Sequence, residues 1–275
     1  MVSAFNIGLI TATCLLVPKV VLADNHHPYL SNQHAFYAGF YDQRSDALLM
    51  AQRGDFEPIK FEFEDIGLSD DYTSVMLEYQ YRLSDNWQLS ASSYRFTEGG
   101  GKTLNSTLNY AGEEFEAGVF VRSDIKVNTY IIDAMYHVFR SDRGEISLGA
   151  GIHALDNELN LESRLEIDGE SVRERRRASA SVLAPLPNLR ASGFYAFNDK
   201  WSVMATAGWL SLTVDNIDGD FRYGHLRANY RMTQSLGISL GYQWASIGVT
   251  EATSDGVDLF DLEFTGTTAA LTYTF

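Results

Sequence analysis

Apolar and polar residues alternate with a period of two along much of this chain. In the segment 73–83, TSVMLEYQYRL, Val75, Leu77 and Tyr79 fall on one face and Glu78 and Arg82 fall on the other. Successive side chains of a β-strand point to opposite faces, so this pattern predicts a strand with one apolar and one polar face. A globular sheet with its apolar face turned toward a core gives the same alternation, so this segment alone does not decide between a protein core and lipid.

The alternating segments come in pairs joined by short polar turns. The turns are SDN at 84–86, RSDRG at 140–144, NDK at 198–200 and TQS at 233–235. The connections between these hairpins are longer and acidic or Gly-rich, and they cover roughly 97–125, 156–188, 214–221 and 250–261. Short turns at one end and long loops at the other are typical of a transmembrane barrel.

Two further segments, 34–49 and 263–275, supply an opening and a closing strand. The sequence therefore predicts an all-β fold, a transmembrane antiparallel up-and-down β-barrel of ten strands with both termini on the short-turn side. Parts of 54–64 and 101–122 also alternate, and we expect them to be outer extensions of the neighbouring strands. Eight or twelve spanning strands are the alternatives.

Large aromatic residues lie beside the short turns, where amphipathic rings would sit at the depth of the lipid headgroups. The predicted interface aromatics are Tyr81, Trp87, Tyr136, Tyr195, Trp201, Tyr230, Tyr273 and Phe275. Trp209 and Trp244 are expected to anchor the barrel as well.

The chain ends on LTYTF, with the alternation running to the last residue. Each unpaired backbone group in lipid costs several kcal/mol, so the sheet must close and this strand must pair with the first. The terminal Phe275 also resembles the C-terminal signature of bacterial outer-membrane proteins that the barrel assembly machinery recognises. We expect that machinery as a partner during insertion.

The N-terminus has an apolar run followed by small Ala23, too short for a comfortable helical span of roughly 20 residues. We interpret 1–23 as a cleaved export signal and 24–275 as the barrel with its surface loops; an uncleaved anchor helix is the alternative. Cys14, the only cysteine, falls inside this segment. The mature chain would then have no disulfide and no cysteine-based metal site.

The charge balance is strongly acidic. Residues 1–23 contain one Lys and no acid, so the mature chain carries 20 basic against 36 acidic residues, a net charge of −16. Such a balance repels nucleic acid. We predict no nucleic-acid partner.

Three segments resemble a family of uncharacterised, small, porin-like outer-membrane β-barrel proteins of proteobacteria. They are FEDIGLSDDYTSVMLEYQYRL at 63–83, LAPLPNLRASGFYAFNDKWSV at 183–203 and LGISLGYQW at 236–244, about a fifth of the chain. The resemblance implies a β-barrel in the outer membrane of a Gram-negative cell envelope. It implies no activity and no functional residues.

The rows opposite the apolar ones contain ionisable residues. The predicted interior polar network comprises Glu78, Arg82, Asp133, His137, Arg190, His225, Arg227 and Arg231, with His153, Tyr223 and Asn229 in the same rows. Because a charge in a narrow barrel must find a partner or water, we expect a salt-bridged plug. A narrow path for small anions, favoured by the arginines, is the alternative.

Catalysis is the weakest of the functional hypotheses. His225 lies near Asp215, Asp218 and Asp220, and His153 precedes Asp156, so a base oriented by a carboxylate is conceivable. The chain has no GxSxG, HExxH or P-loop motif. We therefore predict no enzyme, no catalytic residues, no cofactor and no metal.

One basic cluster lies in the acidic loop region. Arg173, Arg175, Arg176 and Arg177 follow a predicted hairpin that turns at DG, 168–169. Guanidinium groups bind phosphates bidentately, so these four are candidates for a lipopolysaccharide contact. Cross-strand pairing with Glu158, Glu162 and Glu166 is the favoured interpretation. The sequence as a whole favours a structural or surface-interaction role through outer loops, with a narrow pore second. It does not indicate an oligomeric state.

Overall fold

A computed structural model of the protein describes residues 27–53, 59–69, 71–110, 113–167, 170–172, 177–214, 217–253 and 256–275. The predicted export signal lies outside these residues. Within them, no helix is long and apolar enough to cross a membrane.

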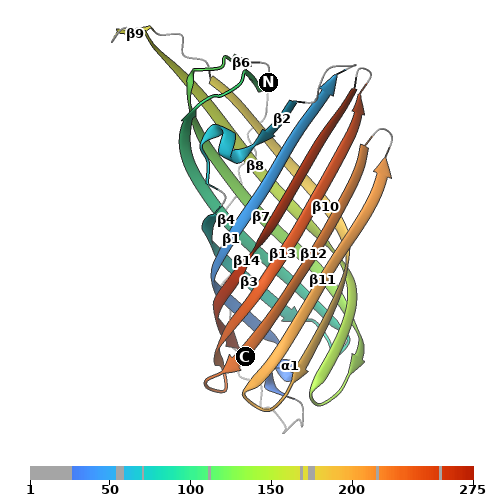
Figure 1. The fold of residues 1–275 in the computed structure, drawn as a ribbon. Coiled ribbons are helices and arrows are strands. Elements are labelled where there is room, and N and C mark those ends of the chain that lie inside the picture. The colour runs from blue at the N-terminus through green and yellow to red at the C-terminus, as the bar shows by residue number, and fades with distance from the viewer. Residues whose placement is uncertain are drawn as a thin grey trace, which may run out of the picture.

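Ten long strands form one closed antiparallel barrel (Figure 1), as the hairpin pattern predicts. They are β1 (His34–Arg53), β3 (Asp71–Arg82), β4 (Trp87–Thr103), β7 (Phe120–Arg140), β8 (Gly144–Ile167), β10 (Arg177–Ala196), β11 (Trp201–Val214), β12 (Ile217–Arg231), β13 (Leu236–Thr253) and β14 (Gly256–Thr274). Each strand pairs with its neighbour in the chain, and the four predicted hairpins are present with their short turns.

The last strand closes the barrel against the first. β14 pairs with β1 along its whole length, with Tyr273 opposite Phe36. At the very end, the N–H of Phe275 donates to the carbonyl of His34 at 3.1 Å, and the N–H of His34 donates to the carbonyl of Phe275 at 2.9 Å. The alternation that runs to the C-terminus is thus explained by a fully paired final strand.

The strands are strongly staggered. Following the paired residues once round the barrel from Tyr195 of β10 leads back to Leu183 of the same strand, a displacement of 12 residues. Stagger and strand number together fix the tilt of the strands in a barrel, which is typically about 35–45°. Residues far apart in sequence therefore meet at the same height inside.

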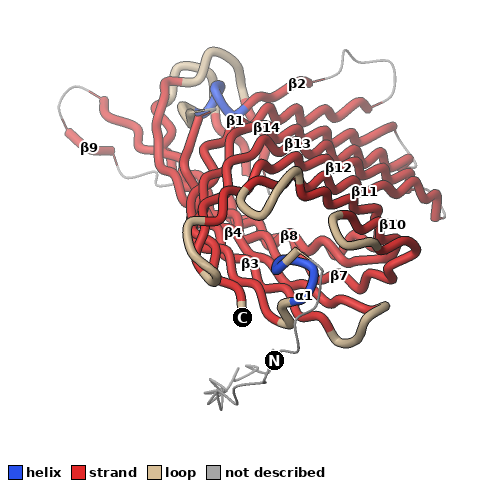
Figure 2. Tube along the Cα trace, turned by 90° about the horizontal axis from the view of Figure 1, so that it is seen from below, coloured by secondary structure: helices blue, strands red, loops and turns tan. Residues whose placement is uncertain are grey.

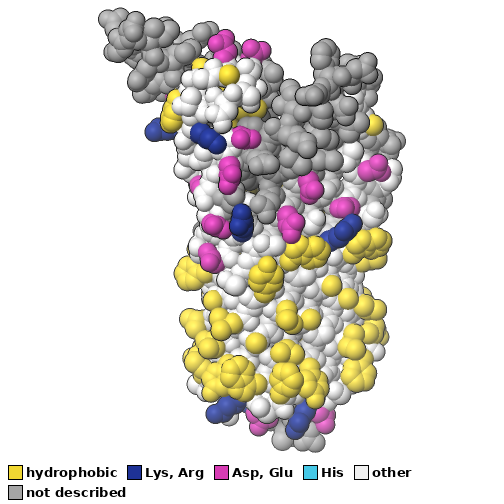
Figure 3. All heavy atoms as spheres, in the orientation of Figure 1, with side chains coloured by type: hydrophobic (Ala, Val, Ile, Leu, Met, Phe, Trp, Pro, Cys, Tyr) yellow, Lys and Arg dark blue, Asp and Glu magenta, His cyan; other side chains and the backbone are white. Residues whose placement is uncertain are grey.

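The outer surface is divided into an apolar and a charged zone. Apolar side chains form a band round the half of the barrel next to the short turns (Figure 3), and β11 crosses it from Trp201 to Trp209. Those nine residues fit a transmembrane strand, which needs about 9–11. Further along the neighbouring strands the outward positions become charged, as at Arg222, Asp261 and Glu263. The other half of the barrel therefore projects beyond the membrane.

The connections at the projecting end are shorter than expected, because the strands continue through most of the predicted loops. The shorter elements there are β2 (Ile59–Glu62), the 3-10 helix η1 (Phe63–Ile66), β5 (Leu108–Tyr110), β6 (Glu113–Phe115) and β9 (Glu170–Val172). β2 extends the sheet beside β1, as predicted. The prediction for 101–122 is only partly correct: the ends of β4 and β7 extend as expected, but β5 and β6 form a separate two-stranded sheet.

The projecting half has an apolar interior, which the expectation of a polar interior missed. Its core is built from buried inward side chains of five barrel strands, β7, β8, β12, β13 and β14, together with inserted segments. The inserted residues are Ile66 at the end of η1, Leu68 just beyond it, Leu104, Leu108 of β5 and Phe115 of β6. Because water surrounds this half, its apolar rows turn inward, as in a soluble barrel, rather than outward toward lipid.

Candidate functional site: the barrel interior

In contrast to the apolar core of the projecting half, the interior of the membrane half contains buried ion pairs. Glu78 of β3 and Arg227 of β12 meet across the interior, with Arg227 Nη1 2.6 Å from Glu78 Oε2 and Nη2 3.2 Å from Oε1. Gln80 donates a further hydrogen bond to Glu78 Oε1 at 2.6 Å. The Arg227 guanidinium also lies 4.5 Å from the centre of the Tyr37 ring. This bidentate, further hydrogen-bonded arrangement offsets the cost of burying both charges.

A second cluster lies close to the short turns. Arg82 Nη1 donates to Glu145 Oε2 at 2.8 Å, and Glu145 Oε1 is 3.2 Å from His137 Nδ1. His137 also hydrogen-bonds Ser147 Oγ at 2.8 Å. Arg140 Nε lies 3.6 Å from the same Glu145 carboxylate. Glu145 is therefore the carboxylate that holds this end of the interior together.

The third pair joins Asp133 of β7 and Arg190 of β10. Arg190 Nε is 3.3 Å from Asp133 Oδ1, and Ser90 donates to Asp133 Oδ2 at 3.3 Å. The Arg190 guanidinium lies 4.4 Å from the centre of the Tyr223 ring. The Nη1 atom of Arg190 has no hydrogen-bond partner among the described residues.

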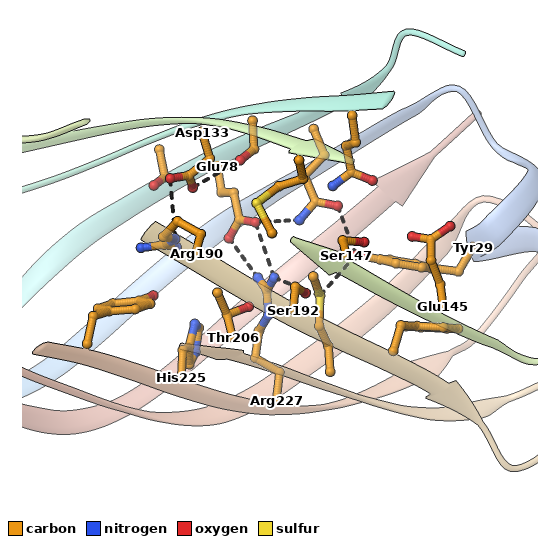
Figure 4. A pocket seen from close by; sticks show the side chains of 18 residues that line it. Tyr29, Glu78, Asp133, Glu145, Ser147, Arg190, Ser192, Thr206, His225 and Arg227 are labelled. Carbon is orange, nitrogen blue, oxygen red and sulfur yellow. Dashed lines mark hydrogen bonds and ion pairs between the residues drawn. The ribbon is translucent and has the colours of Figure 1, made fainter. Parts of the chain in front are cut away.

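These groups surround a cavity of about 50 Å³ (Figure 4). Its wall includes Ser92, Ser192 and Thr206 beside the ion pairs, and the close-up shows Arg190 beside Asp133 and Arg227 directed toward Glu78. At about 10–15 Å³ per probe-sized site, it holds a few water molecules. Two other cavities in the described part of the chain are smaller, at about 30 and 10 Å³.

A short helix, α1 (Pro28–Ser31), closes the interior at the short-turn end (Figure 2). The Tyr29 ring stacks on Phe194 with centroids 4.5 Å apart, and its hydroxyl contacts Tyr37 and donates to Gln80 Oε1 at 3.0 Å. Burial raises the pKa of the Tyr29 phenol, so it remains a neutral donor. Leu30 is fully buried.

The helix is attached at both ends. His27 N–H donates to the carbonyl of Asp142 at 2.8 Å, and Asn32 Nδ2 donates to Thr274 Oγ1 at 2.7 Å. Burial, reinforced by the positive charge of Arg231, lowers the pKa of the His27 imidazole, and Asp199 offsets this only in part. His27 is thus held in its neutral form where it meets the barrel.

An aromatic layer separates the polar interior from the apolar core. His153 lies 4.8 Å from the Phe221 ring, edge to face, and Tyr41 and Tyr94 meet in the same way at 5.8 Å. His153 is 2% exposed, and its Nδ1 has no partner within the described chain. His225 Nε2 lies 3.1 Å from Thr268 Oγ1. Neither histidine is paired with one of the aspartates considered from the sequence, as far as the structure describes them.

The structure brings most of the predicted interior residues together, with one exception. Arg231 does not join the network: it lies at the short-turn rim, where its Nε donates to the carbonyl of Asp199 at 2.7 Å. Sequence reasoning missed Glu145, although it shares the inward row of β8 with His153, eight residues further on. The even spacing between Glu145 and His153 places both on the same face of β8, and this was the signal in the sequence that could have identified Glu145.

The predicted interface aromatics lie on the outer surface next to the short turns. Trp87 and Tyr136 meet edge to face at 5.2 Å, and Trp201 packs against Tyr230 at 4.7 Å. The remaining members, Tyr81, Tyr195, Tyr273 and Phe275, are exposed or half-exposed. Trp209 lies at the opposite edge of the apolar band and is 55% exposed.

Three of the four arginines proposed for lipopolysaccharide, Arg173, Arg175 and Arg176, lie outside the described residues. The backbone of Arg177 begins β10 opposite Glu162 of β8. β9 pairs with the end of β8, with Ile167 opposite Glu170, and the predicted turn at 168–169 itself lies outside the described residues. In the described parts of the chain, no group of three or more His, Cys, Asp or Glu side chains is arranged to hold a metal ion.

Comparison with solved structures identifies the class of protein. The outer membrane protease OmpT of Escherichia coli superposes with a TM-score of 0.58 at 11% identity, covering 89% of this chain and 97% of OmpT. The toluene transporter TodX of Pseudomonas putida gives 0.36 at 10% identity, covering 91% and 92%, and the outer membrane protein OprG of Pseudomonas aeruginosa gives 0.37 at 10%, covering 91% and 98%. No family model and no curated protein matches the sequence.

The chain thus has the fold of the outer-membrane β-barrel proteins of Gram-negative bacteria. Within that class, the likeness to OmpT concerns the ten-stranded architecture alone. At 11% identity it carries no catalytic residue over to this chain.

Proposed function

We propose that this protein is a non-conducting outer-membrane barrel that acts at the cell surface through the strand extensions and loops beyond the membrane. The observation that carries the proposal is that side chains fill the interior at successive heights. Helix α1, the ion pairs, the aromatic layer and the apolar core follow one another from the short turns outward. Ions crossing a barrel need a continuous hydrated path.

The same arrangement argues against the alternative of a narrow pore for small ions or solutes. Arg227, Arg190 and Arg82 are already paired with Glu78, Asp133 and Glu145, and Arg231 lies at the rim. The lining of the cavity beside them includes Tyr29 and Tyr223. An anion entering it would have to displace a carboxylate from an arginine.

The positions of the histidines argue against an enzyme that acts at the outer rim. Five of the six histidines are described; His27, His34 and His137 lie near the short turns, and His153 and His225 lie inside the barrel. A catalytic base must reach its substrate within hydrogen-bond distance. None of these five imidazoles is placed to meet a molecule at the cell surface.

Planar-bilayer recording of the refolded protein tests the proposal. We expect no conductance above the leak in chloride, acetate or large-anion salts, whereas a known porin inserted under the same conditions conducts. A steady, ion-selective current from this protein would overturn the proposal in favour of the narrow pore.

We further propose that the arginine cluster at 173–177 contacts outer-membrane lipids, in particular the phosphates of lipopolysaccharide. Arg173, Arg175, Arg176 and Arg177 are the only basic cluster of a strongly acidic chain. Replacing all four by Ser is expected to reduce the amount of lipopolysaccharide that co-purifies, because bidentate phosphate contacts are lost. An unchanged amount of co-purified lipopolysaccharide would refute this contact. It would not affect the proposal that the barrel does not conduct ions.

A further inference from the structure

A cavity of about 30 Å³ lies at the short-turn end of the barrel interior, apart from the ion pairs. Helix α1 forms part of its wall through His27 and Tyr29. Ser202 of β11, Asn229 of β12 and Thr272 of β14 form other parts of the wall. The short turns of outer-membrane barrels face the periplasm, so this cavity lies on the periplasmic side.

Asn229 is a buried residue of this wall whose hydrogen bonds are missing. It is 8% exposed and lies in the inward row of β12, two residues from Arg227. Neither its Oδ1 nor its Nδ2 atom has a hydrogen-bond partner within the described part of the chain. Burying an amide without partners is costly, so such a group in a folded protein calls for water or a ligand. Asn229 therefore offers both a donor and an acceptor to a molecule in the cavity.

The charges in the wall of the cavity are positive. Lys200 and Arg231 belong to the lining, and no described acidic residue does. Arg231 Nε donates to the neutral backbone carbonyl of Asp199, an exposed residue that is not part of the lining. The larger cavity differs, because its arginines are paired with Glu78 and Asp133. A wall with only positive charges attracts an anion.

The size of the cavity suits the end of a molecule rather than a whole one. At about 10–15 Å³ per water-sized site, it has room for about two or three such groups, enough for the two oxygens of a carboxylate. Lys200 and Leu236 are exposed and belong to the lining, so the cavity reaches the surface. The rest of a ligand can therefore extend into the periplasm.

We propose that this cavity binds the C-terminal carboxylate of a peptide in the periplasm. Lys200 and Arg231 supply positive charge, and a carboxylate oxygen accepts a hydrogen bond from Asn229 Nδ2. The N–H that precedes the terminal residue's carboxylate donates to Asn229 Oδ1, a match that a simple carboxylate such as acetate does not provide. The site faces the compartment opposite the proposed surface role and does not depend on it.

An NMR titration of the isotope-labelled, refolded protein in detergent micelles tests the proposal. The probe is acetyl-Ala-Ala with a free carboxylate, and the readout is the side-chain amide signal of Asn229, which is assigned by its loss in an Asn229→Leu variant. We expect a saturable shift of this signal, with a dissociation constant on the order of 1 mM for a ligand of this size. The same peptide with a C-terminal amide, and acetate, should each bind at least about tenfold more weakly. No saturable shift, or equal binding of the peptide amide or of acetate, would overturn the proposal.

The Asn229→Leu variant keeps the approximate size of the side chain and removes its donor and acceptor. Followed through the backbone amides of Ser235 and Gly237, its affinity for the peptide should fall by about tenfold or more. Asn188→Leu is the matched control, because Asn188 is also buried, at 4% exposure with an unpartnered Oδ1 among the described residues, but does not line the cavity. Equal affinities of these two variants would overturn the proposal.

A second substitution covers the case in which Asn229→Leu does not fold. Lys200→Gln changes an exposed side chain, so the barrel should form normally, and we expect an affinity for the peptide about threefold lower. Arg143→Gln is its control, since Arg143 is an exposed cation in another short turn and is not part of the lining. If the two variants bind the peptide equally well, the cationic wall does not hold a carboxylate and the proposal is refuted.

Discussion

The ion pair between Glu78 and Arg227 allows the energetics of the barrel interior to be tested directly. The side chains of Arg227 and Glu78 are 4% and 14% exposed. The substitution Glu78→Gln keeps the size of the side chain and removes its charge. Leaving one member of a buried pair uncompensated typically costs about 3–5 kcal/mol. The polar cavity beside Arg227 has room for water that would partly solvate the charge, so we expect the lower end, about 3 kcal/mol of unfolding free energy.

The double variant E78L/R227M separates the charge effect from packing. It removes both charges and fills the space with apolar groups, so its stability should be close to that of the unaltered protein or above it. Asp85→Asn is the control for an exposed pair, since Asp85 is 96% exposed and 3.3 Å from Arg140. That substitution should change the unfolding free energy by no more than about 0.5 kcal/mol.

Equilibrium urea unfolding in vesicles, followed by tryptophan fluorescence, measures all three variants. The reasoning requires a large loss for Glu78→Gln that the second substitution recovers. An unfolding free energy of E78Q within about 1 kcal/mol of that of the unaltered protein would equal the effect of breaking an exposed ion pair. The pair would then not be desolvated, and the interior would contain more water than we infer. If the double variant is as unstable as the single one, packing rather than charge carries the effect.

Two further predictions concern the segments that close the two ends. Gly100→Ala would place a Cβ against the carbonyl of Gly67 and displace the loop after η1 from the core, at a cost of about 1–3 kcal/mol in the same unfolding assay. Gly193→Ala is the control and should be tolerated, because the space around Gly193 is open. Equal effects of the two substitutions would contradict the close packing of that loop. The pKa of His27 is lower when α1 is docked than when the imidazole is in water, so protonation of His27 favours the undocked state. We therefore expect α1 to be fully docked above pH about 6.5, the ordinary pKa of histidine, and to loosen as the pH falls below it. The thiol-labelling rate of a Leu30→Cys variant should therefore rise on acidification, and adding His27→Gln should abolish the rise; a rise that persists would exclude His27 as its cause.

Much of the fold could be predicted from the sequence because lipid imposes a simple rule. Over the nine residues from Trp201 to Trp209, alternation alone shows which face meets hydrocarbon, and the short turns fix the order of the strands. The same rule failed beyond the membrane. Val119 and Val121 also alternate with polar residues, but they face inward, because water on the outside of the projecting half reverses the preference.

The sequence by itself left eight or twelve strands as alternatives to ten, but it determined the membrane band and, within that band, the row in which each ionisable residue lies. Only the tertiary structure decided which of these residues meet. Glu78 and Arg227 are 149 positions apart, and they pair because the stagger of the strands brings β3 and β12 to the same height across the interior. Parity along a strand is a local property, whereas height inside a tilted barrel depends on the register of all ten strands together.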